Sequence, residues 1–282
     1  SFRGVDIALF AGGSASKTFA PHAVKAGAVV IDNSSAFRMD PEVPLVVPEV
    51  NPDAVRSHKG IIANPNCSTI IMVMALKPIH DRSRIKRVVV STYQAVSGAG
   101  KEGIDELTNQ VKAISEGRSV EANILPSASL PKHYQIAFNL LPQIDVFLED
   151  GYTKEEMKMV HETRKIMNEP DMAITATTIR VPVYRSHSES VNLELESPLS
   201  VEETKAALAG FPGVVVQDNP AEMEYPMPLY TSGLNEVFVG RIRADESVKH
   251  GLNLWVVGDQ IRKGAALNAL QIAELMIAQN LL

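Results

Sequence analysis

Residues 61–76, IIANPNCSTIIMVMAL, decide the fold and contain the only cysteine of the chain, Cys67. The residues Ile-Ile-Ala at 61–63 are typical of the end of a short buried strand, and Asn64-Pro65-Asn66 predicts a tight turn. From Ser68 onward, apolar residues recur at helical spacing. The pattern therefore predicts that Cys67 lies in the first turn of a helix, where free backbone N–H groups and the helix dipole favour negative charge.

This position makes Cys67 a candidate nucleophile. A thiol at a helix N-terminus ionises more easily than a free cysteine, and the thiolate is the nucleophilic form. The alternative is a small buried hydrophobic side chain, which is the role of most lone cysteines. The surrounding Asn-Pro-Asn-Cys-Ser-Thr at a strand-to-helix junction favours the reactive interpretation.

Composition limits the class of protein. A chain of 282 residues with 45% hydrophobic content is long enough for a sizeable core and predicts two domains. The formal net charge of −6 argues against nucleic-acid and membrane-surface partners. One cysteine excludes an internal disulfide framework and fits a reducing compartment. No apolar run reaches membrane-spanning length and no signal peptide is recognisable, so we expect a soluble, cytoplasmic protein.

The first residues predict a parallel βαβ unit. Residues 5–10 and 28–32 are typical of buried strands, and a loop at 11–16 and a helix at 18–26 connect them. Backbone N–H groups at Gly12 and Gly13 are candidates to hold a phosphate, although a plain connection is the alternative. Because such a unit needs neighbouring strands, we expect a segment to be missing at the N-terminus.

Candidate ligand-binding residues follow the predicted strands. Arg38 follows the second strand and is either an anion ligand or a solvated loop arginine. Gln94 ends the β-branched strand at 86–94, where an ordinary strand-terminal amide is the alternative role. The small residues Ser97 and Gly98 follow it and allow the backbone to approach a ligand closely.

A helix beginning near Thr153 and two strands supply further charged groups. Thr153 and Glu156 form a capping box, and Glu155 and Lys158 share one helix face, where a surface salt bridge is the alternative to a functional pair. A strand at 175–184 carries Arg180, and another spans 190–196.

His187 lies between these two strands and suits a functional imidazole or a hydrogen-bonded structural one. Arg180 and His187 are seven residues apart, so they reach the same pocket only if the chain bends between them.

The last residues, 264–282, predict an amphipathic helix with Leu267, Leu270, Ala273 and Ile277 on one stripe. We therefore divide the chain into a remnant of a nucleotide-binding domain (1–66), a catalytic and dimerisation domain (67–254), and a C-terminal helix that returns to the first domain (255–282).

The combination of NPNCSTI, STYQAVSGAGKEG, RVPVYRSHSES, DNSSAFRMD and GAALNALQIAE closely resembles the bacterial-type aspartate-β-semialdehyde dehydrogenases. The resemblance extends from Val5 to Leu282. It implies an α/β protein with an incomplete Rossmann-like dinucleotide-binding domain and an α+β catalytic and dimerisation domain with a mixed sheet. It also implies NADPH-dependent conversion of L-aspartyl 4-phosphate to the semialdehyde, in lysine, diaminopimelate, methionine, threonine and isoleucine biosynthesis.

The resemblance assigns a role to each candidate residue. Cys67 is similar to the nucleophile that forms an acyl-thioester, His187 to the acid/base and Gln94 to the amide that orients the acyl group. The substrate-binding residues are Arg180 for the carboxylate, Glu155 for the amino group and Asn66 beside the nucleophile. Arg38 and Lys158 correspond to the phosphate-binding pair, and the residues expected to contact the nicotinamide nucleotide are Gly12, Gly13, Ser97, Gly98 and Gln260.

The sequence departs from the family pattern at its start. The family's G-x-x-G-x-V-G loop does not occur in this sequence, and roughly 60 residues are absent when judged against normal domain sizes. We therefore expect weak NADP binding by this chain. The resemblance further implies a homodimer that uses inorganic phosphate, with no metal, nucleic-acid or membrane partner.

Two other functions compete with this interpretation. N-acetyl-γ-glutamyl-phosphate reductase and other acyl-phosphate reductases use similar cysteine and histidine chemistry, but Glu155 argues against an N-acylated substrate. An inactive fragment that keeps only the dimerisation surface is the alternative from a different class.

Overall fold

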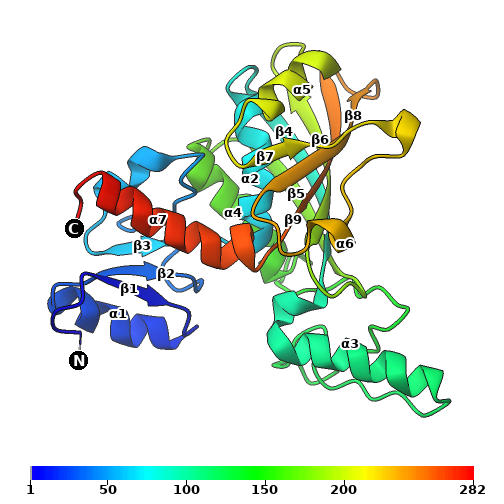
Figure 1. Ribbon diagram of the computed structural model, residues 1–282, viewed down its shortest axis with the longest axis horizontal. Coiled ribbons are helices and arrows are strands. Elements are labelled where there is room, and N and C mark those ends of the chain that lie inside the picture. Colours follow the sequence, from blue (N-terminus) through cyan, green and yellow to red (C-terminus); the bar gives the residue numbers. More distant parts are fainter. Residues whose placement is uncertain (1) are drawn as a thin grey trace.

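A computed structural model describes residues 2–282 and contains two β-sheets (Figure 1). The smaller sheet is parallel with the order β1-β2-β3, and the larger is mixed with the order β5-β4-β6-β9-β8-β7. The expected combination of a parallel Rossmann-like sheet and a mixed sheet is confirmed. The strands are β1 (Ile7–Phe10), β2 (Val29–Asp32), β3 (Ile61–Ala63), β4 (Ile85–Gln94), β5 (Ala173–Arg180), β6 (His187–Leu195), β7 (Val214–Val216), β8 (Val237–Asp245) and β9 (Gly251–Gly258).

Seven α-helices occur within residues 2–282, and the last of them follows the final strand, β9. They are α1 (Ala15–Lys25), α2 (Cys67–His80), α3 (Gly100–Ser115), α4 (Lys154–Met167), α5 (Val201–Ala209), α6 (Pro228–Thr231) and α7 (Leu267–Ala278). Figure 1 shows α2 and α4 between the two sheets, and α3 extending away from both. No helix among residues 2–282 combines the length and the apolar character that a membrane crossing requires.

The central strand β2 of the small sheet is buried on both faces, as its run of apolar residues predicts. Val30 on β2 packs with Ala20 and Ala23 of α1, whereas its neighbours Val29 and Ile31 pack against α7 on the opposite face. The alternation follows from the two-residue period of a strand. α7 thus packs against the first sheet of the chain.

The predicted stripe of α7 is wrong. The residues that face the sheet are Ala269, Ile272, Ala273 and Met276. Leu270 and Ile277 from the predicted stripe are 48% and 57% exposed. Because apolar residues occur all around this helix, their spacing does not select a face, and the small side chains of Ala269 and Ala273 allow the closest approach to the strands.

α2 forms the centre of the larger core. Eleven of its residues are buried, among them Ile70, Ile71, Met74 and Leu76. They pack against Val88 and Val90 of β4 and against the apolar residues of β6 and β9. Packing on every side of α2 therefore fixes the position of its N-terminal residue, Cys67.

The predicted strand boundaries around the two candidate cationic residues need correction. β5 ends at Arg180 rather than continuing to Tyr184, and β6 begins at His187 rather than at Ser190. Ser186 adopts a left-handed backbone conformation with φ of 70° just before β6. The six residues between the strands supply the bend that the odd spacing requires, so both side chains reach the same pocket.

One row of the large sheet carries polar groups within the core. Thr178, Thr92 and Glu189 are aligned across β5, β4 and β6 and are all buried. Among residues 2–282, the two hydroxyl groups and both carboxylate oxygens of Glu189 have no hydrogen-bond partner. Burial raises the pKa of Glu189 well above its usual range.

This pKa predicts a pH-dependent stability. Above an unfolded-state pKa of about 4.3 the unfolded chain releases the Glu189 proton while the folded chain keeps it, so the free energy of unfolding falls as pH rises. Glu189→Gln removes this loss. Relative to the unmodified protein, we expect its Tm to rise progressively between about pH 5 and pH 8, as measured by thermal unfolding.

Glu194→Gln is the matched control, because Glu194 lies on the same strand with a side chain that is 26% exposed and pairs with Lys86. A Tm difference for Glu189→Gln that stays constant across the pH range contradicts the prediction.

Candidate active site

Cys67 is the first residue of α2, and this prediction is confirmed. Asn66 caps the helix, since its Oδ1 accepts hydrogen bonds from the backbone N–H groups of Ser68 at 3.1 Å and Thr69 at 3.2 Å. Cys67 is half-buried, and a Cβ atom on Gly264 would lie 3.1 Å from its Cβ. Glycine at position 264 therefore allows the turn before α7 to pack against the nucleophile candidate.

A cavity of about 250 Å³ brings the predicted residues together. Nine of the thirteen predicted site residues line it, and they come from parts of the chain that are distant in sequence: Arg38, Asn66, Cys67, Gln94, Gly98, Glu155, Lys158, Arg180 and His187. Ser35 and Ile144 line it too. Gly12, Gly13, Ser97 and Gln260 do not.

Glu155 and Lys158 form an ion pair with a nitrogen–oxygen distance of 3.1 Å, and Lys158 also binds Asp145 at 2.9 Å. Glu155 is buried, so this is not a surface salt bridge. Burial raises the pKa of Glu155, but Lys158 and the hydrogen bonds from Asn66 and Gln94 outweigh it and leave the pKa lowered. Glu155 and Lys158 thus stay charged. They contact each other, and both line the cavity.

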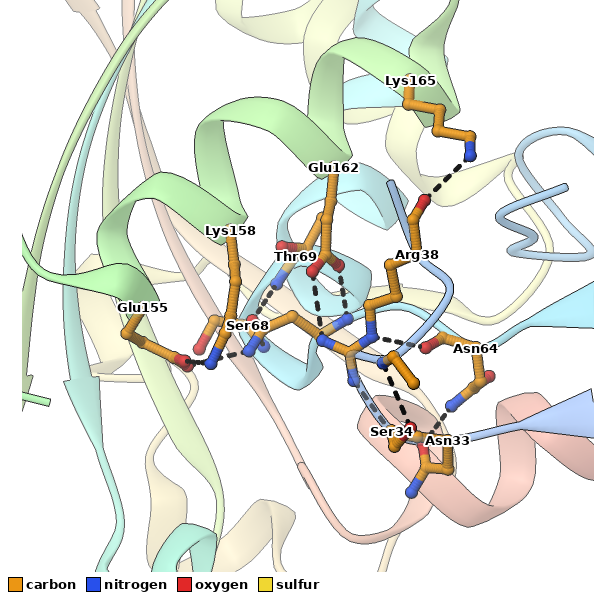
Figure 2. A network of polar contacts seen from close by, with 12 residues as sticks. Asn33, Ser34, Arg38, Asn64, Ser68, Thr69, Glu155, Lys158, Glu162 and Lys165 are labelled. Carbon is orange, nitrogen blue, oxygen red and sulfur yellow. Dashed lines mark hydrogen bonds and ion pairs between the residues drawn. The ribbon is translucent and has the colours of Figure 1, made fainter. Parts of the chain in front are cut away.

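Arg38 is more extensively bound than a solvated loop arginine (Figure 2). Its Nε donates to the carbonyl of Asn64 at 2.9 Å and its Nη2 to the carbonyl of Asn33 at 3.0 Å. Its Nη1 pairs with Glu162 at 3.1 Å. A guanidinium has five N–H groups, so two remain for a ligand in the cavity.

Glu162, Asp145 and Ser68 belong to this network, but the sequence analysis did not single them out. Glu162 follows Glu155 by seven residues on α4, and this helical spacing is a usable signal that it shares the same face. Ser68 accepts a hydrogen bond from Gln94 Nε2 at 2.7 Å. Asp145 has no local signal, because it reaches Lys158 from an irregular segment.

The end of the large sheet holds Arg180 and His187 together. Arg180 Nη1 donates to the carbonyl of Ala95 at 2.7 Å, and the backbone N–H of Ala95 donates to His187 Nδ1 at 3.0 Å. A Cβ atom on Gly98 would lie 2.7 Å from Arg180 Nη1 and 3.3 Å from the His187 ring. Glycine at position 98 therefore leaves room for both side chains.

His187 does not titrate near neutral pH as a free histidine does. Burial, with a smaller contribution from Arg180, lowers the pKa of His187 well below its usual range. Since Nδ1 accepts a hydrogen bond, the neutral ring carries its proton on Nε2. Nε2 has no partner among residues 2–282, so it is available to donate in the cavity.

The expectation that the Cys67 thiol ionises easily is also wrong. Burial and the Glu155 carboxylate raise the pKa of Cys67 to about 12, against the opposing effects of Arg180, Arg38 and the Ser68 N–H group. The helix N-terminus contributes as predicted, but desolvation is larger. A change in the charge of Glu155 consequently has a direct effect on the nucleophile.

The remaining predicted residues form two groups. Gln260 donates through Nε2 to Ser97 Oγ and accepts from the backbone N–H of Ser186 at 2.9 Å, which places both beside the cavity. Gly12 and Gly13 lie in the loop between β1 and α1, at the carboxyl edge of the parallel sheet. Gly13 has φ of 58°, and a Cβ atom added there would meet no other atom within 4 Å.

These contacts predict the reactivity of Cys67. Glu155→Gln removes a negative charge that raises the thiol pKa, whereas Arg180→Gln removes a positive charge that lowers it. At about pH 8 we expect iodoacetamide to alkylate Cys67 up to about tenfold faster in the first variant and more slowly in the second. The measurement is the pH–rate profile of alkylation, with Glu202→Gln on the first turn of α5 as the control. The reverse order of rates contradicts the prediction.

Comparison with known protein families supports one assignment for both sheets. Residues 1–58 match the family described as semialdehyde dehydrogenase, NAD binding domain, and residues 76–263 match semialdehyde dehydrogenase, dimerisation domain. The first match overlaps the parallel sheet, so the expected loss of the nucleotide-binding segment is not confirmed. The same holds for the expectation of weak NADP binding, which depended on it.

Individual relatives agree. The chain is 60% identical to aspartate-semialdehyde dehydrogenase of Aquifex aeolicus over 285 aligned residues, which cover 100% of this chain and 82% of the relative. Aspartate semialdehyde dehydrogenase II of Vibrio cholerae, solved in complex with ASA, has a TM-score of 0.93 and 48% identity, covering 99% of this chain and 81% of that chain. The enzyme of Candida albicans, solved with NADP, has a TM-score of 0.73 and 26% identity, covering 98% and 78%.

The domain matches and the identity along the full chain lead to one conclusion: the chain belongs to the aspartate-semialdehyde dehydrogenase family.

Proposed function

We propose that the protein is an NADP-dependent aspartate-semialdehyde dehydrogenase that converts L-aspartyl 4-phosphate to L-aspartate 4-semialdehyde and phosphate. This reaction serves the biosynthesis of lysine, diaminopimelate, methionine, threonine and isoleucine. The observation that carries the proposal is the single cavity in which a cysteine at a helix N-terminus faces both carboxylate and cationic groups. The relatives are aspartate-semialdehyde dehydrogenases, so the alternative acyl-phosphate reductases and an inactive fragment are not favoured.

Cys67 attacks the acyl carbon of the substrate. A carbon–sulfur bond forms, the bond between the acyl carbon and the phosphate oxygen breaks, and inorganic phosphate leaves with the bonding electrons and takes up the proton that the thiol loses. The product is an acyl-thioester on Cys67, which divides a difficult conversion into acyl transfer and reduction.

Glu155 and Arg180 orient the amino acid part of the substrate. Glu155 pairs with the ammonium group and Arg180 with the α-carboxylate, for which a guanidinium offers two parallel donors. Glu155 also raises the thiol pKa, so neutralisation of its charge by the ammonium group favours the thiolate. Substrate binding thereby activates its own nucleophile.

Arg38 and Lys158 hold the phosphate group. The two N–H groups of Arg38 that are not used within the protein and the ammonium group of Lys158 supply positive charge to a dianion. Lys158 is bound between Asp145 and Glu155, which keeps it at the rim of the cavity. These contacts stabilise the leaving phosphate as negative charge builds up on it.

His187, Gln94 and Asn66 act next to the thioester. The Nε2–H of His187 donates to the acyl oxygen as negative charge develops there, a task that suits a neutral imidazole. Gln94 is held by Ser68 and orients the acyl group, while Asn66 fixes the first turn of α2 beneath the sulfur.

The nicotinamide cofactor supplies the hydride that reduces the thioester. Gly12 and Gly13 would hold its phosphates, and Ser97, Gly98 and Gln260 would contact its nicotinamide nucleotide. Ser97 is fixed for this task by its hydrogen bond from Gln260.

The proposal includes the organisation of the protein. The nucleotide domain comprises residues 1–66, the catalytic and dimerisation domain residues 67–254, and the segment 255–282 covers the small sheet. Since β9 continues to Gly258, the second boundary belongs after that strand. The active form is a homodimer in the cytoplasm.

Replacement of the nucleophile tests the reaction. We expect Cys67→Ser to lower phosphate-dependent reduction of NADP⁺ by aspartate semialdehyde at least about 1,000-fold, because a serine hydroxyl is a much weaker nucleophile in this position. The measurement is NADPH absorbance with and without phosphate, and an unchanged Tm shows that the variant is folded. Undiminished phosphate-dependent oxidation by Cys67→Ser would overturn the proposed mechanism.

A further inference from the structure

Glu162 on α4 is a buried carboxylate with two different partners. Only 1% of the residue is exposed, and its side chain lies on the same helix face as Glu155 and Lys158 (Figure 2). Its Oε2 accepts a hydrogen bond from the backbone N–H of Asn66 at 2.6 Å, and its Oε1 pairs with Arg38 Nη1 at 3.1 Å. One side chain therefore contacts the cap of the nucleophile helix and the proposed anion-binding arginine.

The hydrogen bond between Glu162 and Asn66 fixes the turn before Cys67. Glu162 binds the backbone of Asn66, and Glu155 accepts a hydrogen bond from the Asn66 side chain at 2.8 Å. The two glutamates lie two turns apart on α4, so the asparagine is bound from both ends. The Oδ1 atom of Asn66 is then directed at the N–H groups of Ser68 and Thr69, as capping requires.

The ion pair between Glu162 and Arg38 fixes the orientation of the guanidinium. Glu162 binds Nη1 while two backbone carbonyls bind Nε and Nη2, which leaves the side chain little freedom to rotate. The main chain is also bound to α4, because Lys165 Nζ donates to the carbonyls of Arg38, Asp40 and Val43 at 2.8, 2.7 and 2.8 Å. α4 thus determines where the remaining two N–H groups of Arg38 point.

We infer that Glu162 is a positioning residue that sets the relative geometry of the phosphate site and the nucleophile. It does not line the 250 Å³ cavity, so it acts through Arg38 and Asn66 rather than by contact with substrate. The inference rests on the proposed functions of Arg38 and Cys67. A rigid connection of this kind holds the phosphate and the sulfur at the separation that acyl transfer requires.

The test compares Glu162→Gln with Glu156→Gln. Both variants make the same chemical change on the same helix at buried positions. Glu156 accepts from the backbone N–H groups of Thr153 at 2.7 Å and Thr178 at 3.0 Å and contacts neither Arg38 nor Asn66. In each variant the glutamine NH2 group faces one of the two N–H donors that the carboxylate accepted from, so both variants lose stability. Only Glu162→Gln changes the contacts of residues that line the cavity.

In the unmodified protein, we expect inorganic phosphate to slow the alkylation of Cys67 by iodoacetamide, because the proposed phosphate site and Cys67 share one cavity. We expect the phosphate concentration that gives half protection to rise about tenfold in Glu162→Gln and to stay within about twofold in Glu156→Gln, a difference equivalent to about 1.4 kcal/mol. In turnover, Glu162→Gln raises the KM for phosphate and lowers kcat by about tenfold or more, while the KM for the aldehyde changes less than about twofold.

Equal effects of the two variants on phosphate protection and on the alkylation rate overturn the inference, because Glu162 is then only a structural residue. Absence of phosphate-dependent turnover in the unmodified protein refutes the proposed function instead, and the alkylation rates of the two variants still decide the role of Glu162. If Glu162→Gln does not fold, Glu162→Asp takes its place. It keeps the charge but is too short to reach both donors, and the same contrast with Glu156→Gln is expected.

Discussion

The buried N-terminus of α2 is the constraint on which the site depends. A helix start in the interior requires partners for its free N–H groups, and a single asparagine supplies two of them through Oδ1. The same residue accepts a hydrogen bond from the N–H group of Ile70 and is bound by two carboxylates of α4. Because Asn66 is fixed in this way, Cys67 has a defined position before any ligand arrives.

The second property of the site is a balance of charge. The cations Arg38, Lys158 and Arg180 are matched by Glu162, Asp145 and Glu155 within one region. In this balance the sulfur stays protonated and the imidazole stays neutral, since burial disfavours the charged form of each. In the proposed reaction, the ammonium group of the substrate neutralises Glu155, the carboxylate that raises the pKa of the thiol. Reactivity is thus a property of the complex rather than of the protein alone.

Short sequence patterns correctly predicted where α2 and α4 begin. The start of α2 at Cys67 and the capping box at Thr153 are present as predicted, because each depends on a few neighbouring residues. The buried face of α7 was predicted incorrectly, since its apolar residues surround the helix and only the sheet beneath it selects a side. The thiol pKa was wrong for a related reason: desolvation depends on segments that are distant in sequence.

The candidate site was predictable residue by residue only through resemblance. Nothing in the spacing of Arg38 and Glu162 indicates that they meet, because 124 residues separate them. Residues such as Glu162 and Asp145, which bind other side chains rather than a ligand, leave no motif in the sequence. Their identification requires the fold.

The contact between the turn at Gly264 and Cys67 has a consequence for biosynthesis of the protein. Asn268 donates to Asn64 Oδ1 at 2.6 Å, so residues near the C-terminal end hold the turn that precedes the nucleophile. A chain emerging from the ribosome presents Cys67 long before these residues exist. The reactive centre is therefore completed only after residues 264–268 have been synthesised, and until then the growing polypeptide has a thiol without its final surroundings.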